Sequence, residues 1–419
     1  MPNPVARAAE VIAPARLGRP FRWLLASSFV NNVGDGVVLA AGPLLVASLT
    51  QDPFLVSLAL FMGYLPVLLF ALIGGVAADR FDRRRMVIVA DLGRALVLVA
   101  LVSTIVAGAE GIPLVLLALF LLGTLETFAD SASSTLLPGI VARADLGTAN
   151  ARMQSAFVLA NQLLLPPVGA FLFVVGPAVP FATNAICFVV GALLVSRVVV
   201  RGRVARSAAP GPVRTQLAEG VRWLLHHPPM RTLALTIFAF NVTFGAAWSV
   251  LVLYAGERLG MGEVGFGLLT TAVAIGGLIG TSAYGFLERR FSLADIMRVG
   301  LLIETFTHLS LALTTSSVWA LGTLVVFGGH AFVWGTTATV VRQRAVPDEM
   351  LGRVGGVYRV AITGGMVIGT PIGGLLATAF GITAPFWFGF AGSAILVALL
   401  WREFAHIAHA GAVEAPAPG

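Results

Sequence analysis

The sequence predicts an all-α integral membrane protein, with about twelve transmembrane helices in two six-helix parallel repeats. Of its 419 residues, 58% are hydrophobic and 11% are charged, and the mean hydropathy is +0.92. This apolar share exceeds that of ordinary soluble domains. Apolar stretches of membrane-spanning length, about 20 residues each, recur along the whole chain. One long polar stretch divides them into two halves of similar length.

Turn and charge signals divide the apolar sequence into twelve segments, each of which we expect to form a transmembrane helix. Glycine, at 47 residues, and proline, at 22, suit such helices. Small residues allow helices to approach closely, and neighbouring helices satisfy backbone groups that proline frees. The expected segments are residues 22–48, 54–78, 86–107, 112–137, 151–174, 178–199, 231–255, 264–286, 293–314, 318–340, 355–379 and 383–402.

The arginines predict the orientation, because positive charge concentrates in short cytoplasmic loops. With the N-terminus in the cytoplasm, 25 of the 27 basic residues, all of them arginine, fall on the cytoplasmic side. Arg258 falls in an outer loop, and Arg94 lies within a helix. We therefore expect both termini in the cytoplasm, in a plasma or inner membrane. The pI of about 10.8 does not indicate nucleic-acid binding, because the arginines form no basic face.

Residues 201–230 are expected to be a cytoplasmic linker between one helical bundle at 1–200 and a second at 231–419. Ala-Ala-Pro-Gly-Pro at 208–212 is typical of a flexible connector, and an amphipathic helix is expected around Leu217 to Leu225. The halves repeat with an offset of 205 residues, a plan known among transporters; the alternative is chance recurrence of small residues. The recurring features are Gly75 and Arg84-Arg85 with Gly280 and Arg289-Arg290, Leu146-Gly147 with Leu351-Gly352, and Pro166 with Pro371.

A charged motif ends the second expected helix. The segment Gly75-Val-Ala-Ala-Asp79-Arg80-Phe-Asp82-Arg83-Arg84 resembles the loop signature of the major facilitator superfamily, Gly-x-x-x-Asp-Arg-x-Gly-Arg-Arg/Lys. Asp82 stands where that pattern has glycine, a change similar to the branch of enterobactin and macrolide exporters. The resemblance spans essentially the whole chain and implies the major facilitator fold and transport by alternating access. We expect a functional monomer.

Asp79 is expected to act as a conformational latch, together with Gly75, Arg80, Arg83 and Arg84. A carboxylate at this end can accept hydrogen bonds from a helix N-terminus and complement its dipole. The expected partner is the start of the eleventh helix, around Gly355 and Gly356. The contact would exist only with the cytoplasmic side closed and would bias one of two states. The alternative is that these charges only fix topology. Tyr284 is taken as the second-half equivalent of Asp79.

Two further segments combine proline with glycine. Leu165-Pro166-Pro167-Val168-Gly169-Ala170 resembles the antiporter signature Gly-Pro-x-x-Gly-Gly with both flanking glycines altered, and the eleventh helix carries Gly369-Thr-Pro371-Ile-Gly373-Gly374. Pro166, Gly169, Pro371 and Gly373 are expected to permit helix bending and tight helix contacts. The fourth helix lacks the arginine that marks drug–proton antiporters of the superfamily.

Ionisable residues within a membrane span are costly and therefore indicate functional sites. Asp35 lies near the middle of the first helix, beside Asn31, and Glu126 and Asp130 lie one turn apart on the fourth. The resemblance implies that helices one, four, seven and ten line a central cavity where these carboxylates meet. We expect Asp35 and Glu126 to bind protons or a cationic substrate, because burial favours a protonated carboxylate. The alternative is a structural hydrogen bond to Asn31 or Thr127.

The same layout implies that Asn241 and Trp248 of helix seven and His330 and Trp334 of helix ten face this cavity. Arg94, Glu304 and His308 lie on helices three and nine, which are peripheral in the superfamily. We expect Arg94 to pair with Asp91 or to extend toward the membrane surface. No arginine lies on helix one or four at the depth of Asp35 and Glu126 to pair with them permanently, and Arg94 starts from a peripheral helix.

These features favour a secondary active transporter, a proton-coupled exporter of a small amphipathic organic molecule such as a drug, macrolide or siderophore. A nutrient or metabolite importer of the same fold remains open, as does a sensor or lipid translocator. An ATP-driven pump or membrane enzyme is disfavoured, because no Gly-x-x-x-x-Gly-Lys loop, His-Glu-x-x-His motif or nucleophile elbow occurs. We expect no cofactor and no metal site, and the single Cys187 allows no internal disulfide.

Overall fold

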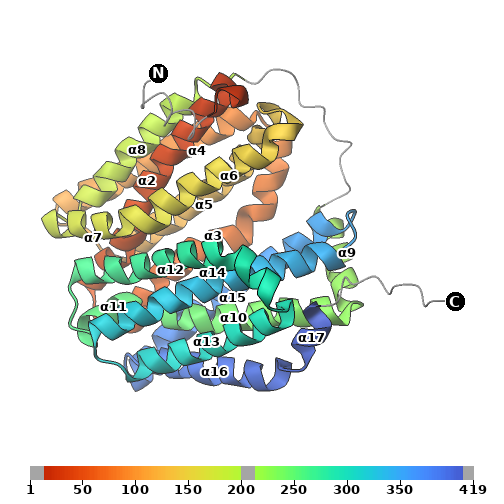
Figure 1. The fold of residues 1–419 in the computed structure, drawn as a ribbon. Helices are drawn as coiled ribbons and strands as arrows, with labels where there is room; N and C mark the ends of the chain where they lie inside the picture. Colours follow the sequence, from red (N-terminus) through yellow and green to blue (C-terminus); the bar gives the residue numbers. More distant parts are fainter. Residues whose placement is uncertain (1–13, 200–212, 409–419) are drawn as a thin grey trace, which may run out of the picture. The chain divides into compact units, whose positions relative to one another are not determined.

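The computed structural model describes residues 14–199 and 213–408, and within these residues it is helical with no strand (Figure 1). The expected connector at 208–212 and both chain ends lie outside the described residues. The elements are η1 (Ala15–Leu17), α2 (Gly18–Leu49), α3 (Pro53–Arg80), α4 (Arg83–Val106), α5 (Ile112–Leu136), η2 (Leu137–Gly139), η3 (Arg143–Asp145), α6 (Leu146–Ala156), η4 (Phe157–Leu164), α7 (Leu165–Val175), α8 (Val179–Val195), α9 (Val213–Leu225), α10 (Pro228–Trp248), α11 (Leu251–Glu257), α12 (Glu263–Arg290), α13 (Leu293–Leu313), α14 (Ser317–Ala345), α15 (Leu351–Phe380), α16 (Ala384–Leu400) and α17 (Glu403–Ala408).

Ten helical stretches among the described residues are long and apolar enough to cross a membrane. Two further apolar helices, α8 and α16, have 17 residues each. Each of the twelve segments expected from the sequence overlaps one of these stretches, and the boundaries differ by up to eight residues. The protein is therefore a multi-pass α-helical membrane protein, and the count of twelve spans stays a prediction. The linker helix is also present, as α9.

The fifth expected helix is not a regular α-helix. Its middle, η4, is π-helical and ends directly before Pro166 and Pro167 in α7. Pro167 has no backbone N–H to donate to the carbonyl of Leu163, and the hydroxyl of Thr271 donates to that carbonyl instead, at 3.3 Å. Such wide turns occur where a proline interrupts the hydrogen-bond ladder. The predicted irregularity at Pro166 is thus a local change of helix type.

The seventh expected helix, predicted as one segment over 231–255, is divided into α10 and α11. The break falls at Ser249 and Val250, and Ser249 donates its hydroxyl to the carbonyl of Ala246 at 3.0 Å. A serine that bonds back to its own helix competes with the backbone ladder. This is a feature that apolar periodicity alone does not reveal.

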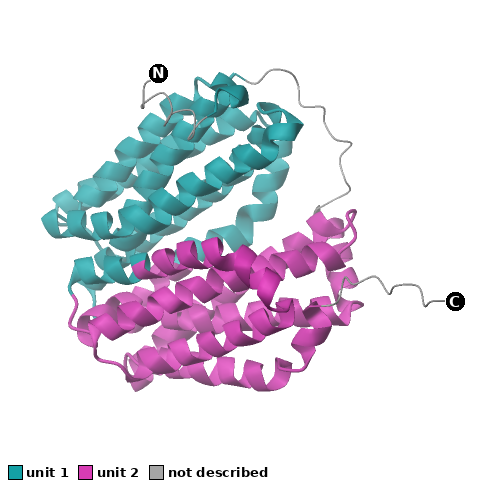
Figure 2. Ribbon diagram, viewed as in Figure 1, with its two compact units in different colours: residues 1–51, 62–209, 262–271 teal, residues 52–61, 210–261, 272–419 magenta. Residues whose placement is uncertain are grey.

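The chain forms two compact units, coloured separately in Figure 2. Unit 1 contains residues 1–51, 62–209 and 262–271, and unit 2 contains 52–61, 210–261 and 272–419. Unit 1 therefore includes the first residues of α12, and the rest of α12 belongs to unit 2. Unit 2 includes the first residues of α3, and the rest of α3 belongs to unit 1. In unit 2, the start of α3 packs on α15, where Gly374 leaves room for Ser57 and Thr378 bonds Asp52 at 3.2 Å.

The same helix pairings occur in both units. In unit 1, α2 packs against α7 and α8, and α4 packs against α5 and α8. In unit 2, α10 packs against α15 and α16, and α13 packs against α14 and α16. The two halves therefore repeat in their packing as well as in their sequence.

The offset between the halves differs from the predicted single value. α6 begins at Leu146 and α15 at Leu351, so the 205-residue offset holds there. However, α3 begins at Pro53 and α12 at Glu263, 210 residues later, because α13 and the turn after it are shorter than α4 and its turn. Arg289, rather than Tyr284, therefore corresponds to Asp79. The counterpart of the capping residue Asp82 is Ser292, whose hydroxyl also caps a helix, α13.

Glycines hold α15 against α10 along most of its length. Gly365, Gly369 and Gly373 recur every fourth residue, and a Cβ on any of them would collide with a backbone carbonyl of α10, at Phe238, Val242 and Ala246 respectively. In unit 1, a Cβ on Gly169 would likewise collide with the carbonyl of Val37. Gly169 and Gly373 thus provide the tight contacts predicted for them. α15 runs through Pro371 as one helix, and bending at Pro166 and Pro371 during transport remains a prediction.

Gly369→Ala should destabilise the protein by about 1–3 kcal/mol, because the added methyl group forces α15 away from α10. The matched control is Gly335→Ala on α14, where a Cβ would meet nothing within 4 Å. Thermal unfolding of the detergent-purified variants measures both changes. Equal melting temperatures for the two variants would contradict this account of the glycine stripe.

Candidate functional site

Arg94 lies in the middle of α4 and is buried, with 5% of its side chain exposed. It pairs with Asp91 one turn earlier on the same helix. It also reaches across to α2, where its guanidinium lies 3.7 Å from a carboxylate oxygen of Asp35. The pairing with Asp91 confirms the prediction for Arg94. The contact with Asp35 was not expected, because the third helix was taken as peripheral.

Two further side chains hold this arrangement in place. The amide of Asn31 donates to the second oxygen of Asp91 at 3.0 Å. The guanidinium of Arg94 lies 4.0 Å from the centre of the Phe188 ring in α8, which is a favourable cation–π geometry. Asp91 is fully buried. The arginine is thus fixed by α2, α4 and α8 together.

Glu126 and Asp130 of α5 complete the group. Both have exposed side chains, and both lie within electrostatic range of Asp35, as Glu126 does of Arg94. An exposed carboxylate in a membrane-spanning helix requires contact with water rather than lipid. The lipid-compatible positions of α5 are Leu114, Leu117 and Leu121, earlier in the helix. We call Asp35, Asp91, Arg94, Glu126 and Asp130 the Arg94 cluster.

The Arg94 cluster has more acids than it can neutralise. Within the membrane-spanning part of unit 1, three carboxylates, those of Asp35, Asp91 and Glu126, interact with the one guanidinium, and the carboxylate of Asp130 interacts with Asp35 and Glu126. If all four were ionised, the cluster would carry a net charge of minus three, which is strongly unfavourable for carboxylates within a membrane span. At least some of these carboxylates must therefore hold a proton or share a bound cation.

The structural alternative proposed for these carboxylates does not fit the hydrogen bonds. Asn31 uses its amide on Asp91 rather than on Asp35. Thr127 donates its hydroxyl to the carbonyl of Gly123 in its own helix, at 2.8 Å. Asn31 and Thr127 thus direct these groups to other partners, and the structural hydrogen bond of Asp35 is instead with the side chain of Asn184.

Aromatic side chains form a continuous stack in unit 2. Trp334 lies parallel to Phe240, Phe240 to Phe244, and Phe244 to Trp248 and Phe327, with ring centres 4.9–6.2 Å apart. We call these five residues the aromatic stack. Trp248, Trp334 and His330 were predicted to share one surface, and the stack brings them together, with the edge of His330 against Phe240 and Phe327.

Asn241 does not join this group. Its side chain donates to the carbonyl of Ile237 in its own helix at 2.7 Å, and its Cβ lies against Gly365 of α15. The sequence placed Asn241 with Trp248 because both are on α10. The two residues are seven positions apart, about two helical turns, so they lie on similar sides of α10 but at different heights with different neighbours.

A second ionisable group lies wholly inside unit 2. Glu304 of α13 is fully buried, and its two carboxylate oxygens contact His308 at 2.9 Å and His330 at 3.2 Å. Glu304 and His308 were predicted to be peripheral, but their side chains point inward to α14. His330 was predicted to lie on the cavity-facing side of its helix, more as a packed hydrogen-bonding residue than as a titrating one, and it is buried and hydrogen-bonded to Glu304. Metal-binding geometry is absent from the described residues.

Arginine side chains near the loop after α3 bind backbone carbonyls of neighbouring segments. Arg83 donates to the carbonyls of Ala78 and Thr135, and Arg84 to those of Ser196 and Val198. These bonds satisfy the last carbonyls of α3, α5 and the segment after α8. Asp82 caps α4 by accepting the N–H of Arg85 at 2.9 Å. Asp82, which stands where the superfamily signature has glycine, thus has a structural role as a helix cap.

Asp79 and Arg80 are exposed at the end of α3, and a Cβ on Gly75 would meet nothing within 4 Å. The start of α15, the predicted partner of Asp79, belongs to unit 2. There Arg353 pairs with Glu219 of α9 at 3.0 Å, and Gly220 lets α9 approach the backbone of Arg353. The contact between Asp79 and α15 stays a prediction.

Arg94 is the functional candidate that the sequence reasoning set aside. The signal was present, because it is the one arginine placed deep within a predicted span, and a charge at that depth indicates a site. The same signal applies to Glu304. Both were discounted because their helices are peripheral in the superfamily, although a long side chain on such a helix can point inward.

Comparison with known proteins agrees with this architecture. The family described as "Transmembrane secretion effector" matches residues 9–415. The "Multidrug efflux pump Tap" of Mycolicibacterium fortuitum is 28% identical over 381 residues, covering 88% of this chain and 91% of the relative. An "Enterobactin exporter EntS" of Escherichia coli O1:K1 / APEC is 26% identical over 390 residues, covering 86% and 89%.

Solved structures share the fold. A bacterial homologue of the iron transporter ferroportin, in an inward-facing state, superposes with a TM-score of 0.74 at 18% identity, covering 93% of this chain and 98% of that one. The nucleoside transporter NupG superposes with a TM-score of 0.70 at 12% identity, covering 93% and 99%. With residues 9–415 matched, the chain belongs to the transmembrane secretion effectors of the major facilitator superfamily, a family of transporters rather than enzymes.

Proposed function

We propose that this transporter exports a small amphipathic organic molecule by alternating access, in exchange for protons bound at the Arg94 cluster. The observation that carries the proposal is the surplus of three carboxylates over the single guanidinium of that cluster. Asp91 is tied to Arg94 and Asn31. Asp35, Glu126 and Asp130 are therefore the residues that can gain and lose protons as access to the site changes. Proton occupancy would then favour one conformational state over the other.

The aromatic stack indicates the kind of molecule that is exported. Phe240, Phe244 and Trp248 are partly exposed and offer flat apolar faces. Such faces bind planar or hydrophobic groups, and they attract a positive charge through the negative face of the ring. The names of the relatives, a multidrug efflux pump and an enterobactin exporter, support export of an organic molecule over import of a nutrient.

Uptake into inverted proteoliposomes tests this function with ethidium, a planar aromatic cation, and with enterobactin as a second probe. An acidic lumen should drive accumulation of at least one probe, and collapse of the pH gradient should abolish it. A sodium gradient of equal size should have no effect. Accumulation driven only by sodium, or movement of the probe together with protons toward the cytoplasmic side, would favour a different coupling ion or an importer.

Asp79 is proposed to latch the cytoplasmic side against α15, and Asp79→Asn should slow ethidium transport about tenfold while leaving expression unchanged, since a hydrogen-bonded charge contributes about 1.5–3 kcal/mol. Asp82→Ser is the matched control, because it removes one negative charge from the same loop and keeps a capping hydroxyl like that of Ser292. Initial transport rates measure both variants. Equal rates in Asp79→Asn and the wild type would contradict the proposed role of Asp79 as a latch.

Both termini are proposed to lie in the cytoplasm of a cell-membrane protein that works as a monomer. The arginine-rich segments support this orientation, among them the loop after α3 and the end of α12. A phosphatase that is active only outside the cytoplasm, fused after Gly419, should therefore stay inactive. Activity of that fusion would mean that the orientation proposed for the spans is wrong.

A further inference from the structure

The Glu304 cluster, comprising Glu304, His308 and His330, is not used by the mechanism above. Glu304 is completely buried, and no more than 3% of either imidazole side chain is exposed. Each imidazole directs its Nε2 atom toward a different oxygen of the same carboxylate. The Nδ1 atoms of both rings are buried and have no hydrogen-bond partner in the described residues. Each ring therefore has one buried nitrogen, Nδ1, that no hydrogen bond within the described residues occupies.

The sequence makes room for both rings. Gly389 of α16 lies beside His308, and an added Cβ there would come within 2.6 Å of its Nδ1 atom. Gly300 of α13 lies beside His330, and an added Cβ would come within 2.9 Å of its Nδ1 atom. Both glycines belong to helices that pack closely, α13 and α16. The absence of a side chain at Gly389 and Gly300 thus leaves the space that the two imidazole rings occupy.

Among the described residues, Glu304 forms ion pairs with His308 and His330 and with no other charged side chain. α16 carries no ionisable residue, and the acidic, arginine and histidine residues of the other neighbouring helices lie toward the helix ends. These residues are Asp295 and Arg298 of α13, Arg231 of α10, Glu263, Glu288, Arg289 and Arg290 of α12, Arg342 and Arg344 of α14, and Glu403 and His406 of α17. The protonation state of the cluster therefore depends on its own three members.

Counting protons then identifies the stable state. With Glu304 ionised and both imidazoles neutral, the cluster carries one negative charge, and with both imidazoles protonated it carries one positive charge. One added proton, whether on His308, His330 or Glu304, makes it neutral. Because a net charge enclosed among apolar side chains is unfavourable, the neutral state with one proton is preferred. This count holds whichever of the three groups carries the proton.

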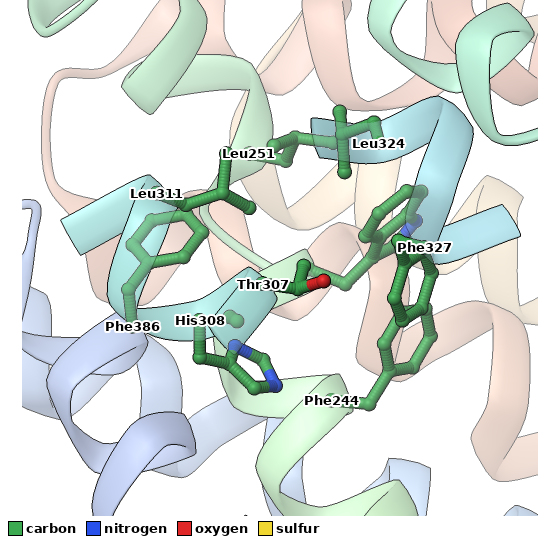
Figure 3. Close-up of a pocket in the computed structure, with 10 residues that line it drawn as sticks. Phe244, Leu251, Thr307, His308, Leu311, Leu324, Phe327 and Phe386 are labelled. Carbon is green, nitrogen blue, oxygen red and sulfur yellow. The ribbon is translucent and has the colours of Figure 1, made fainter. Parts of the chain in front are cut away.

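A small cavity connects the cluster with the aromatic stack. It has a volume of about 10 Å³, close to the minimum for one water. Its polar lining residues are Thr307, His308 and Trp248, and Phe244 and Phe327 of the stack also line it (Figure 3). His308 is the member of the Glu304 cluster that lines this cavity.

From this geometry we propose that Glu304, His308 and His330 form a second proton-binding site, in unit 2, which holds a single exchangeable proton. It is separate from the Arg94 cluster of unit 1 and shares no residue with it. His330 contacts Phe240 and Phe327 edge-on, so gain or loss of the proton changes the charge directly beside the aromatic stack. The site thus places a proton next to the surface that we propose binds the exported molecule.

Histidine-selective ¹⁵N NMR of the full-length protein in nanodiscs tests this site, with infrared detection of a protonated carboxyl. His308→Gln and His330→Gln identify the two signals. At neutral pH the wild-type cluster should hold one proton, seen as one imidazolium shared between the rings or as a carboxylic acid band. Glu304→Gln should lose that proton and leave both rings neutral, because the glutamine is uncharged. In D₂O the proton signal should shift as it exchanges.

The exposed pair His406 and Glu403 is a matched reference in the same unit, with ring and carboxylate 3.6 Å apart. Glu403→Gln should change the signal of His406 and leave those of His308 and His330 unchanged. Glu126→Gln, which alters the other cluster, should also leave them unchanged, so the test is independent of coupling in unit 1. Two neutral rings without a carboxylic acid band, or two imidazoliums, in the wild type would overturn the proposal. The wild-type spectrum alone decides this if Glu304→Gln fails to fold.

Discussion

Glu126→Gln is expected to abolish ethidium accumulation driven by a pH gradient, while exchange of ethidium across the membrane without a gradient continues. Glutamine keeps the size and hydrogen-bonding capacity of protonated glutamate but cannot release a proton. Glu126 is the exposed carboxylate on α5 that interacts with both Asp35 and Asp130. Without its proton exchange, the free energy of the gradient no longer acts on the conformational equilibrium. The expected loss is to the level of protein-free vesicles.

Glu263→Gln is the control for this variant. It makes the same chemical change at an exposed position in the first turn of α12, outside the Arg94 cluster, and should transport at the wild-type rate. Asp35→Asn should share the phenotype of Glu126→Gln. If both variants keep full gradient-driven accumulation, the coupling protons bind elsewhere, and Asp130 and the Glu304 cluster become the positions to test.

Arg94→Gln is expected to prevent accumulation of folded protein or to lower its stability by about 3–5 kcal/mol. That is the typical cost of removing one partner from a buried ion pair and leaving the other charge uncompensated. Asp91 is completely buried against Arg94 and would keep only its bond from Asn31. Thermal unfolding and size-exclusion chromatography of the purified variant measure this loss.

The double variant Arg94→Gln with Asp91→Asn separates stability from function. It removes both charges of the pair and should recover most of the lost stability, since amide side chains can bond each other. It should nevertheless fail to couple transport to protons, because Asp35 loses its cationic partner 3.7 Å away. Arg402→Gln, at an exposed position, is the control. A single variant as stable as the wild type would show that Arg94 is not the centre of the cluster.

Helix positions followed from the sequence with good accuracy because lipid requires long uninterrupted apolar segments with satisfied backbones. The irregularities did not follow. The π-helical turn at Phe157–Leu164 precedes two prolines and is accompanied by a hydrogen bond from the distant Thr271 to Leu163, and the break at Ser249 falls inside an apolar stretch. Hydropathy encodes neither feature, because it averages over single polar groups and their partners.

The repeat was predicted with the wrong register in its first half. An ungapped offset of 205 residues aligned Arg84 with Arg289, whereas the helix starts at Pro53 and Glu263 are 210 residues apart. The five-residue difference lies in α13 and the turn after it, and nothing in the local composition marks a deletion there. The correct register aligns the two capping residues, Asp82 and Ser292. Each accepts a backbone N–H at the start of the following helix, one through a carboxylate and the other through a hydroxyl.

The candidate site was predicted in part. Asp35, Glu126 and Asp130 were found because a carboxylate in a span is rare and expensive, and the structure groups them. Arg94 and Glu304 were seen and then discounted on the position of their helices. Side-chain direction decides this question, and it depends on helix rotation, which a sequence of largely apolar residues around the whole helix leaves undetermined.

The most direct test of proton-coupled export measures both fluxes at once. Proteoliposomes with a trapped pH-sensitive dye, clamped at zero membrane potential, receive ethidium on the side that corresponds to the cytoplasm. Ethidium uptake should be accompanied by proton movement in the opposite direction, and both fluxes should disappear together in the Asp35→Asn and Glu126→Gln variants. Ethidium uptake without any proton movement, or with protons moving in the same direction, would contradict the account.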